Sequence, residues 1–141
     1  MSNSIDRLDA VVVAEGIRTG AFTSREAVEA NLARLDAVNP RLNAVVDVLR
    51  EEALSRADAA DAETRAGGPL PPLHGVPVTV KINVDWEGRP TDNGVVAYKD
   101  FVARSDSSST RAWRRAGAVV IGRTNTPAFS MRAFTSNDLH A

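Results

Sequence analysis

The chain has 141 residues, of which 43% are hydrophobic, so it is long enough to enclose an apolar core. Its 17 basic and 18 acidic residues almost cancel, which leaves no long-range field to attract nucleic acid or an acidic membrane surface. The absence of cysteine excludes disulfides and thiolate nucleophiles, and two histidines are too few for a histidine-rich metal site. The apolar run 11–14 is far shorter than a spanning helix or a signal-peptide core. We therefore expect a cytoplasmic protein with no nucleic-acid or membrane partner.

Two helices are expected at the start of the chain. Apolar spacing predicts a short helix over residues 6–17 and a longer one over residues 23–38. Thr23 or Ser24 can cap the longer helix. Asn39-Pro40 is expected to stop it, because a proline disfavours the helical conformation in the residue before it. This helical region, about residues 5–38, is predicted to be the first part of the domain.

The remainder, about residues 43–141, is predicted to be an α/β region. A valine-rich run over 43–49 predicts a strand. The alanine-rich, charged segment 51–66 predicts a largely exposed helix, which Gly67-Gly68-Pro69 ends.

A βαβ-like unit is predicted next. Residues 75–80 and 118–121 are apolar enough for strands, and residues 107–116 are expected to form the intervening helix. In such a unit the strands are parallel, so their carboxyl ends meet at one edge of the sheet. We therefore expect Lys81 and the segment 122–125 to lie at the same edge.

Lys81 is the candidate catalytic residue, because it stands where an apolar strand ends and a loop begins. Held half-buried against Val78, Val80 and Val84, its charged form would lose hydration, which favours the neutral amine that can act as a base. The alternative is a lysine whose stem lies along apolar surface while its ammonium stays in water.

A longer pattern surrounds this lysine. The segment 73–81, Leu-His-Gly-Val-Pro-Val-Thr-Val-Lys, is followed by Thr91 and Gly94, and later by Ala-Gly-Ala-Val-Val-Ile-Gly-Arg-Thr-Asn over residues 116–125. Together these segments resemble the amidase signature family. The resemblance implies an α/β fold, the N-terminal part of a mixed sheet flanked by helices.

The resemblance also implies a function, hydrolysis of the carbon–nitrogen bond of small-molecule carboxamides without a metal or organic cofactor. In that family a lysine placed like Lys81 is the base, which takes the proton of a nucleophilic serine through a bridging serine in a cis peptide. Residues 134–140 resemble the segment leading to the family's Gly/Ser-rich loop, but no such loop follows within the chain. Only Lys81 of the triad is therefore carried over.

We expect residues 1–141 to be an N-terminal portion of an amidase domain that is inactive alone. Its expected partners are a second copy of itself or a complementing C-terminal polypeptide. The alternative function is non-catalytic, a remnant or partner-binding module that folds by association with another chain.

The sequence departs from the family pattern in four places. Ile82 occupies the place of an acidic residue, and residues 91–95, Thr-Asp-Asn-Gly-Val, stand where Thr-Thr-x-Gly-Ser is common. Arg123 replaces a common lysine, which keeps the charge but changes its geometry, and Ala128 replaces a common glutamate. None of these changes removes Lys81, so they bear on the substrate more than on the family.

Other candidate residues have alternative interpretations. The serines of segment 107–110 are better explained by helix capping than as a nucleophile. Asn125 could orient a substrate or hold a loop, and the resemblance favours a substrate-binding position near the active site. His74 is expected to be a loop residue, not a base, and Trp86 and Trp113 to be packing residues.

Overall fold

A three-stranded mixed sheet lies at the centre of residues 4–141, the part of the chain that the computed structural model describes. Its strands are β1 (Val45–Val48), β2 (Pro77–Lys81) and β3 (Val119–Thr124), in the order β1-β3-β2. The central strand β3 pairs antiparallel with β1 and parallel with β2. The α/β fold class expected from the sequence is therefore confirmed.

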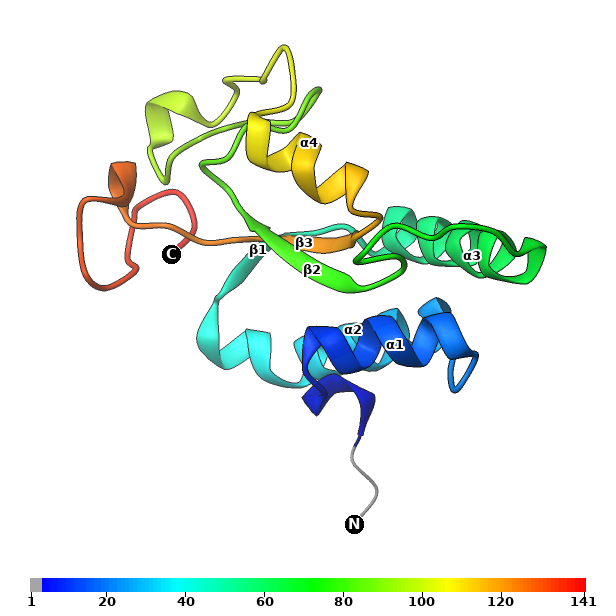
Figure 1. Cartoon of the computed structure of the whole chain (residues 1–141). Coiled ribbons are helices and arrows are strands. Elements are labelled where there is room, and N and C mark those ends of the chain that lie inside the picture. The colour runs from blue at the N-terminus through cyan, green and yellow to red at the C-terminus, as the bar shows by residue number, and fades with distance from the viewer. Residues whose placement is uncertain (1–3) are drawn as a thin grey trace.

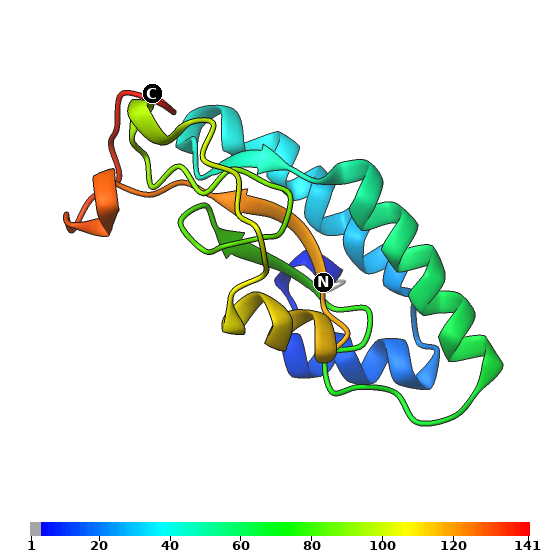
Figure 2. The same ribbon diagram turned by 90° about the horizontal axis from the view of Figure 1, so that it is seen from above.

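Helices cover both faces of this sheet (Figure 1). Helices α1 (Ala10–Thr19) and α2 (Ser24–Leu42) lie on one face, and α4 (Ser108–Arg115) lies on the other. Helix α3 (Arg50–Ala66) runs alongside α2, as the view from above shows (Figure 2). Three short 3₁₀ turns complete the order of elements, Ile5–Arg7, Val96–Tyr98 and Ala128–Ser130.

The first helix differs from its prediction. Residues 6–17 were expected to form one helix, but a 3₁₀ turn ends at Arg7 and α1 begins at Ala10. Leu8 and Asp9 between them are extended, with ψ angles of 149° and 150°, so the helical run is broken there.

The end of α2 also differs, because Asn39-Pro40 does not stop the helix. Pro40 lies inside the last turn, where its missing N–H removes one helical bond, and the helix continues to Leu42. It ends at Asn43, which is left-handed and donates its N–H to the Asn39 carbonyl at 2.7 Å. The Asn39 side chain accepts the Val45 N–H at 2.9 Å and donates to the Val45 carbonyl at 2.8 Å. The expected stop residue instead ties α2 to β1.

The core is built on both faces of β3. Val119 and Ile121 pack with buried residues of α2 and α3. Val120 packs on the other side with Leu49 and Val80. A strand buried on both faces is apolar at successive positions, which explains the continuous run in the sequence.

The predicted βαβ-like unit is confirmed. Strands β2 and β3 are parallel neighbours joined through α4, and Lys81 is the register partner of Thr124. Strand β3 extends three residues beyond the predicted end at Ile121, because Gly122 and Arg123 also pair with β1. The α3 prediction is confirmed to within one residue, but four of its residues are buried, so it is less exposed than expected.

The segment between Lys81 and α4 is irregular, as expected, and the C-terminal residues lie against it in both views (Figures 1 and 2). Asn137 Nδ2 donates to the Thr126 carbonyl at 2.7 Å, and His140 Nε2 lies 3.0 Å from Asp92 Oδ2. These contacts gather the loops at the carboxyl edge of β2 and β3. Within residues 4–141, no helix has both the length and the apolar character needed to cross a bilayer.

Candidate active site

Lys81 ends β2, where the sheet gives way to the irregular loops. Its side chain is half-buried, and Nζ donates to the Ser130 hydroxyl at 3.1 Å. The other lysine of the chain, Lys99, lies 3.9 Å from an Asp100 oxygen, whereas no carboxylate of residues 4–141 lies within ion-pairing distance of Lys81. The candidate base is therefore held by a neutral hydroxyl group.

Ser130 is a residue that the sequence interpretation missed. Besides Lys81, its hydroxyl contacts Asn83 Nδ2 at 2.9 Å and Thr126 Oγ1 at 2.8 Å. Phe129 and Ser130 both have positive φ angles, 53° and 58°. Lys81 and Ser130 are separated by 49 residues, and only the pairing of β2 with β3 brings them together. A serine in a loop carries no pattern that could have indicated this contact.

Asn125 lies at the same edge, immediately after β3. Its Nδ2 donates to the Asn43 carbonyl at 3.2 Å, and its Oδ1 accepts from the Thr126 N–H and from Asn137 Nδ2, both at 2.8 Å. It also lines a hollow of about 430 Å³ between the ends of α2 and β3 and the C-terminal segment. These bonds support the loop-holding alternative, and the hollow leaves room for a ligand beside it.

Ile82 and Arg123, two of the departures from the family pattern, meet behind the lysine. Arg123 is fully buried, and its Nη2 donates to the Ile82 carbonyl at 2.9 Å. Its Nη1 lies 3.6 Å from Asp47 Oδ2, and burial lowers the pKa of Arg123 while Asp47 opposes that change. Arg123 Nε and Nη1 have no hydrogen-bond partner among residues 4–141. The buried Arg123 side chain therefore fixes the backbone just after β2 from the protein interior.

The segment 91–95 forms a turn around a buried carboxylate. Asp92 Oδ1 accepts the Gly94 N–H at 2.7 Å, and Asp92 Oδ2 contacts His140 Nε2. The pair fixes the C-terminal segment to this turn. Within residues 4–141, no group of three or more histidine, aspartate or glutamate side chains is placed to hold a metal ion.

The serine-rich segment caps a helix, as expected. Ser107 precedes α4, and its hydroxyl accepts the Thr110 N–H at 3.1 Å. Neither group contacts Lys81. The capping interpretation is confirmed.

His74 and the tryptophans have structural contacts. His74 lies in a turn, as expected, but it is 2% exposed, and its Nε2 lies 2.9 Å from the Ala60 carbonyl. Trp86 packs against the cluster around Val120, and the Arg114 guanidinium lies 4.5 Å from its ring centroid. Trp113 is 36% exposed, so it packs less completely than expected.

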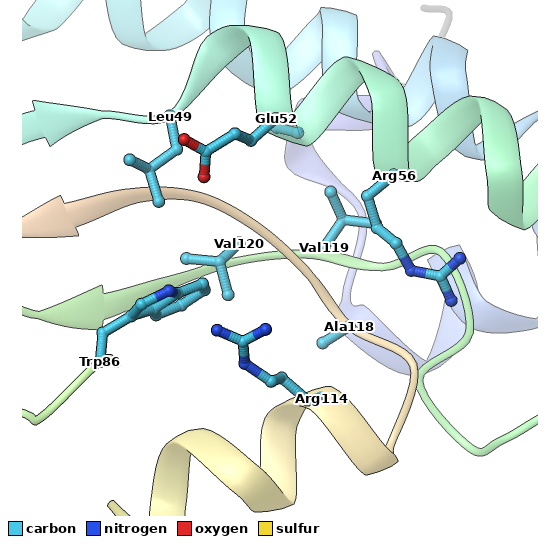
Figure 3. A pocket seen from close by; sticks show the side chains of 9 residues that line it. Leu49, Glu52, Arg56, Trp86, Arg114, Ala118, Val119 and Val120 are labelled. Atoms are coloured by element: carbon cyan, nitrogen blue, oxygen red, sulfur yellow. The ribbon is translucent and has the colours of Figure 1, made fainter. Parts of the chain in front are cut away.

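A hollow of about 290 Å³ opens between α3, α4 and β3 (Figure 3). Its floor includes Val119 and Val120, which begin β3, whereas Lys81 pairs with Thr124 at the other end of that strand. The side chains of Arg56 and Arg114 reach its mouth, but each already pairs with a carboxylate at 2.8 Å. This hollow is therefore separate from the candidate active site.

The Amidase family model matches residues 26–140, which include the lysine strand, the central strand and the loops at their carboxyl edge. The chain therefore belongs to the amidase signature family.

Curated relatives align with nearly the whole of this chain. An indoleacetamide hydrolase of Bradyrhizobium diazoefficiens is 58% identical over 131 residues, which are 93% of this chain and 25% of that enzyme. An acylamidase of Rhodococcus erythropolis is 35% identical over 133 residues, 94% of this chain and 28% of that enzyme. The chain thus spans about a quarter of the length of the curated relatives it matches.

Solved structures share this arrangement of elements. A bacterial aryl acylamidase superposes with a TM-score of 0.87 at 28% identity, over 94% of this chain and 28% of that enzyme. A fatty acid amide hydrolase superposes with a TM-score of 0.92 over 99% of this chain and 25% of that enzyme. At 24% identity, the similarity to this second structure shows a shared fold and nothing more.

Proposed function

We propose that residues 1–141 supply the lysine-bearing N-terminal part of an amidase domain, with Lys81 as its catalytic base. The observation that carries the proposal is the position of this amine, half-buried at the carboxyl edge of β2 with no carboxylate beside it. A general base must lie within hydrogen-bond reach of hydroxyl groups, and this amine contacts a neutral hydroxyl and no carboxylate. The helical region, about residues 5–38, and the α/β region, about 43–141, are proposed as two parts of this one domain.

The proposed reaction is amide hydrolysis through an acyl-enzyme. A serine oxygen attacks the amide carbonyl carbon, and its proton passes through a bridging serine, in a cis peptide, to the neutral amine of Lys81. The resulting ammonium returns the proton to the leaving nitrogen as the carbon–nitrogen bond breaks. Water then hydrolyses the ester with the same base. Both serines would belong to the family's Gly/Ser-rich region, which residues 1–141 do not contain.

The proposed substrates are small carboxamides with an apolar acyl group. The relative at 58% identity is named for the hydrolysis of indoleacetamide, so this amide is the first to test. Asn125 is proposed as a substrate-side residue, because it lines the hollow beside the end of β3. A cytoplasmic location stays a prediction of the sequence.

A chimera tests this function. Residues 1–141 would replace the matching quarter of the Bradyrhizobium indoleacetamide hydrolase, and the turnover of indoleacetamide would be measured. Lys81→Ala should lower kcat/KM by about 100-fold or more, the usual contribution of general-base catalysis. Lys81→Arg should be no better, because a guanidinium stays protonated at any working pH. Lys99→Ala, a change in the only other lysine, is the matched control and should leave turnover unchanged. Near-normal turnover of the arginine variant would reject Lys81 as the base.

The 141-residue chain alone should not turn over aryl or aliphatic amides, because a base without its nucleophile cannot form an acyl-enzyme. Oxyanion-stabilising groups near that nucleophile would also be missing. Incubation of the purified chain with both kinds of amide checks this expectation. Turnover that disappears in Lys81→Ala would mean that the nucleophile lies within residues 1–141.

A partner-binding module is the second candidate function, and one surface feature favours it. Large apolar side chains are exposed around the carboxyl edge of the sheet, from 42% to 83% of their area: Tyr98, Phe101, Phe129, Met131 and Phe134. Such a surface is typical of an interface. Size-exclusion chromatography of the chain, with and without the C-terminal part of the Bradyrhizobium enzyme, would detect the complex.

A further inference from the structure

Three polar side chains meet at the Ser130 hydroxyl: one from the end of β2, one from the loop after β2 and one from the loop after β3. Lys81 Nζ lies 3.1 Å from its oxygen, Asn83 Nδ2 lies 2.9 Å away and Thr126 Oγ1 lies 2.8 Å away. Thr126 is fully buried, and its own hydroxyl donates to the Pro127 carbonyl at 3.1 Å.

The directions of these hydrogen bonds follow from the groups involved. A hydroxyl has one proton to donate and two lone pairs that accept. Lys81 and Asn83 donate N–H groups, so they occupy both lone pairs of Ser130. The Ser130 proton must therefore go to Thr126 Oγ1, whose own proton goes to the Pro127 carbonyl.

This arrangement argues against a nucleophilic role for Ser130. A serine nucleophile needs a lone pair free for attack and its proton directed at a base. The lone pairs of Ser130 are occupied, and its proton points at a threonine hydroxyl instead of at Lys81. What the hydroxyl offers to Lys81 is a fixed acceptor.

The backbone holds that acceptor in a costly conformation. Phe129 and Ser130 are consecutive left-handed residues, and neither is glycine. Each such residue costs about 1–2 kcal/mol, so the surroundings must hold both in place. Phe129 donates its N–H to the Asn93 carbonyl at 2.9 Å, and Ser130 donates its N–H to the Pro127 carbonyl at 2.8 Å. These bonds fix the turn that presents the hydroxyl to the lysine.

We propose that Ser130 is the positioning residue for Lys81, holding Nζ in the orientation in which it exchanges protons. A carboxylate in this place would stabilise the ammonium form by its charge, whereas a hydroxyl orients the nitrogen without adding a charge. The inference rests on the proposed role of Lys81 as base. The proposal thus adds Ser130 to the candidate active site around Lys81.

The first test measures how much Ser130 slows the acetylation of Lys81, and it needs no enzymatic turnover. Residues 1–141 carry two lysines, so a short pulse of acetic anhydride on the chimera, followed by peptide mass spectrometry, compares Lys81 with Lys99 as an internal standard. Lys81 should react more slowly in the native chimera, and both lysines should react equally in concentrated urea. Ser130→Ala should raise the Lys81 rate about two- to tenfold, the factor that one neutral hydrogen bond represents. Ser109→Ala, a change in a serine of α4 that does not contact Lys81, should leave the ratio unchanged.

The second test measures catalysis in the chimera with indoleacetamide. Ser130→Ala should lower kcat about 10- to 100-fold, because a small misplacement of a reacting group is that costly, with KM changed less than about threefold. Ser130→Gly removes the same hydroxyl and relieves the left-handed strain, so its loss of kcat cannot come from unfolding. Thr126→Val removes the acceptor of the Ser130 proton but keeps the contact with Lys81, so its loss should be smaller.

The outcomes separate the two proposals. If Lys81→Ala abolishes turnover while Ser130→Gly changes neither kcat nor the Lys81 labelling rate, the positioning role is wrong and the base assignment stands. If Lys81→Ala retains turnover, the base assignment fails, and the positioning role fails with it. Equal labelling of Lys81 and Lys99 in the native chimera with unchanged residues 1–141 would also overturn the positioning role.

Discussion

Arg123 is a charged side chain with none of its surface exposed, at the end of the strand that positions the candidate site. Its sequence position had suggested a loop after a short strand. The structure instead places it within β3, paired to Val80 of β2 and Asp47 of β1, with its side chain in the interior. Among residues 4–141 its side chain makes one hydrogen bond, to the Ile82 carbonyl at 2.9 Å.

The substitution Arg123→Ala should therefore destabilise the chain strongly. Removing a large, fully buried side chain costs about 2–5 kcal/mol, because it leaves a cavity, and here the Ile82 carbonyl also loses its donor. Asp47 is 31% exposed and keeps Arg89 at 3.3 Å, so it is not left as an unpaired buried charge. Arg123→Lys should cost clearly less, since an ammonium can donate to the Ile82 carbonyl and leaves no guanidinium nitrogens unsatisfied. Urea unfolding curves of the two variants measure the difference. Equal destabilisation by alanine and lysine would contradict this account.

Gly94 is a second residue whose identity is dictated by its surroundings. Its φ is +67°, and a Cβ at this position would lie 2.7 Å from the Thr126 carbonyl oxygen. Gly94→Ala should therefore cost both the left-handed strain and a backbone shift, about 2–4 kcal/mol together. Gly20→Ala is the matched control, because Gly20 has φ +74° but nothing within 4 Å of the added Cβ. Thermal unfolding of both variants should show the larger loss at Gly94, and similar losses would mean that the close approach is relieved at no cost.

At the scale of elements, the sequence predicted what depends on local pattern. Helix α3, strand β2 and the capped α4 follow from periodicity and from Ser107 before its helix. Besides the break in the first helix, the ends of α2 and β3 were wrong, because tertiary contacts decided them. The Asn39 side chain bonds β1 while the helix continues past Pro40, and pairing on both sides extends β3.

In the candidate site too, local pattern predicts one residue, whereas tertiary contacts decide the other. Lys81 could be found from its position at the end of an apolar strand and from the family pattern around it. Ser130 could not, because its contact with Lys81 depends on strand pairing between distant segments and on two left-handed residues without glycine. Such strain leaves no mark in a pattern of apolar and polar residues.

The start of α2 is predicted to make stability depend on pH. Thr23 and Glu26 form a capping box, and the bond from the Thr23 backbone N–H to the Glu26 carboxylate lowers the pKa of Glu26. A carboxylate whose pKa is lowered by folding stabilises the chain above its unfolded pKa of about 4.3, and the contribution is lost as pH falls through the folded value.

The measurement compares unfolding at about pH 6 with unfolding at about pH 3. Glu26→Gln should show a smaller loss between these values than the wild type. Glu51→Gln changes an exposed first-turn acid of α3, a helix whose N-cap makes no side-chain bond, and serves as the control. Removing the cap itself with Thr23→Ala should cost about 1 kcal/mol at neutral pH. An identical pH dependence of wild type and Glu26→Gln would show that the box contributes nothing through this carboxylate.

At the scale of the whole molecule, the sheet of residues 4–141 has one central strand and two edges. Strands β1 and β2 each pair with β3 alone, so one side of each presents unpaired backbone groups. The large apolar side chains that lie exposed near the loops add to this, with Met131 83% and Phe134 66% exposed. Open edges and exposed apolar surface both favour association with another polypeptide.

These features predict that the 141-residue chain alone is marginally stable, molten or self-associating. The stability of an intact domain is about 5–15 kcal/mol, a small difference between large terms, so two unpaired strand edges and the exposed apolar side chains can remove it. Helices α2 and α3 pack against each other and should survive better than the sheet. Far-ultraviolet circular dichroism should then keep its helical signal while the near-ultraviolet signal is weak. That second signal should come mainly from Trp86, which packs on the sheet, because Trp113 is more exposed.

A thermal melt followed at both wavelengths, together with size-exclusion chromatography, tests this expectation. Adding the C-terminal part of the Bradyrhizobium enzyme should sharpen the melt and strengthen the near-ultraviolet signal, because anything that binds only the folded state stabilises it. Trp86→Phe should remove most of that gain in signal, and Trp113→Phe should remove little of it. A sharp cooperative melt from a clean monomer, unchanged by the added polypeptide, would show instead that these residues close their own core. In that case the exposed apolar residues need no covering chain, and the chain is a self-sufficient module.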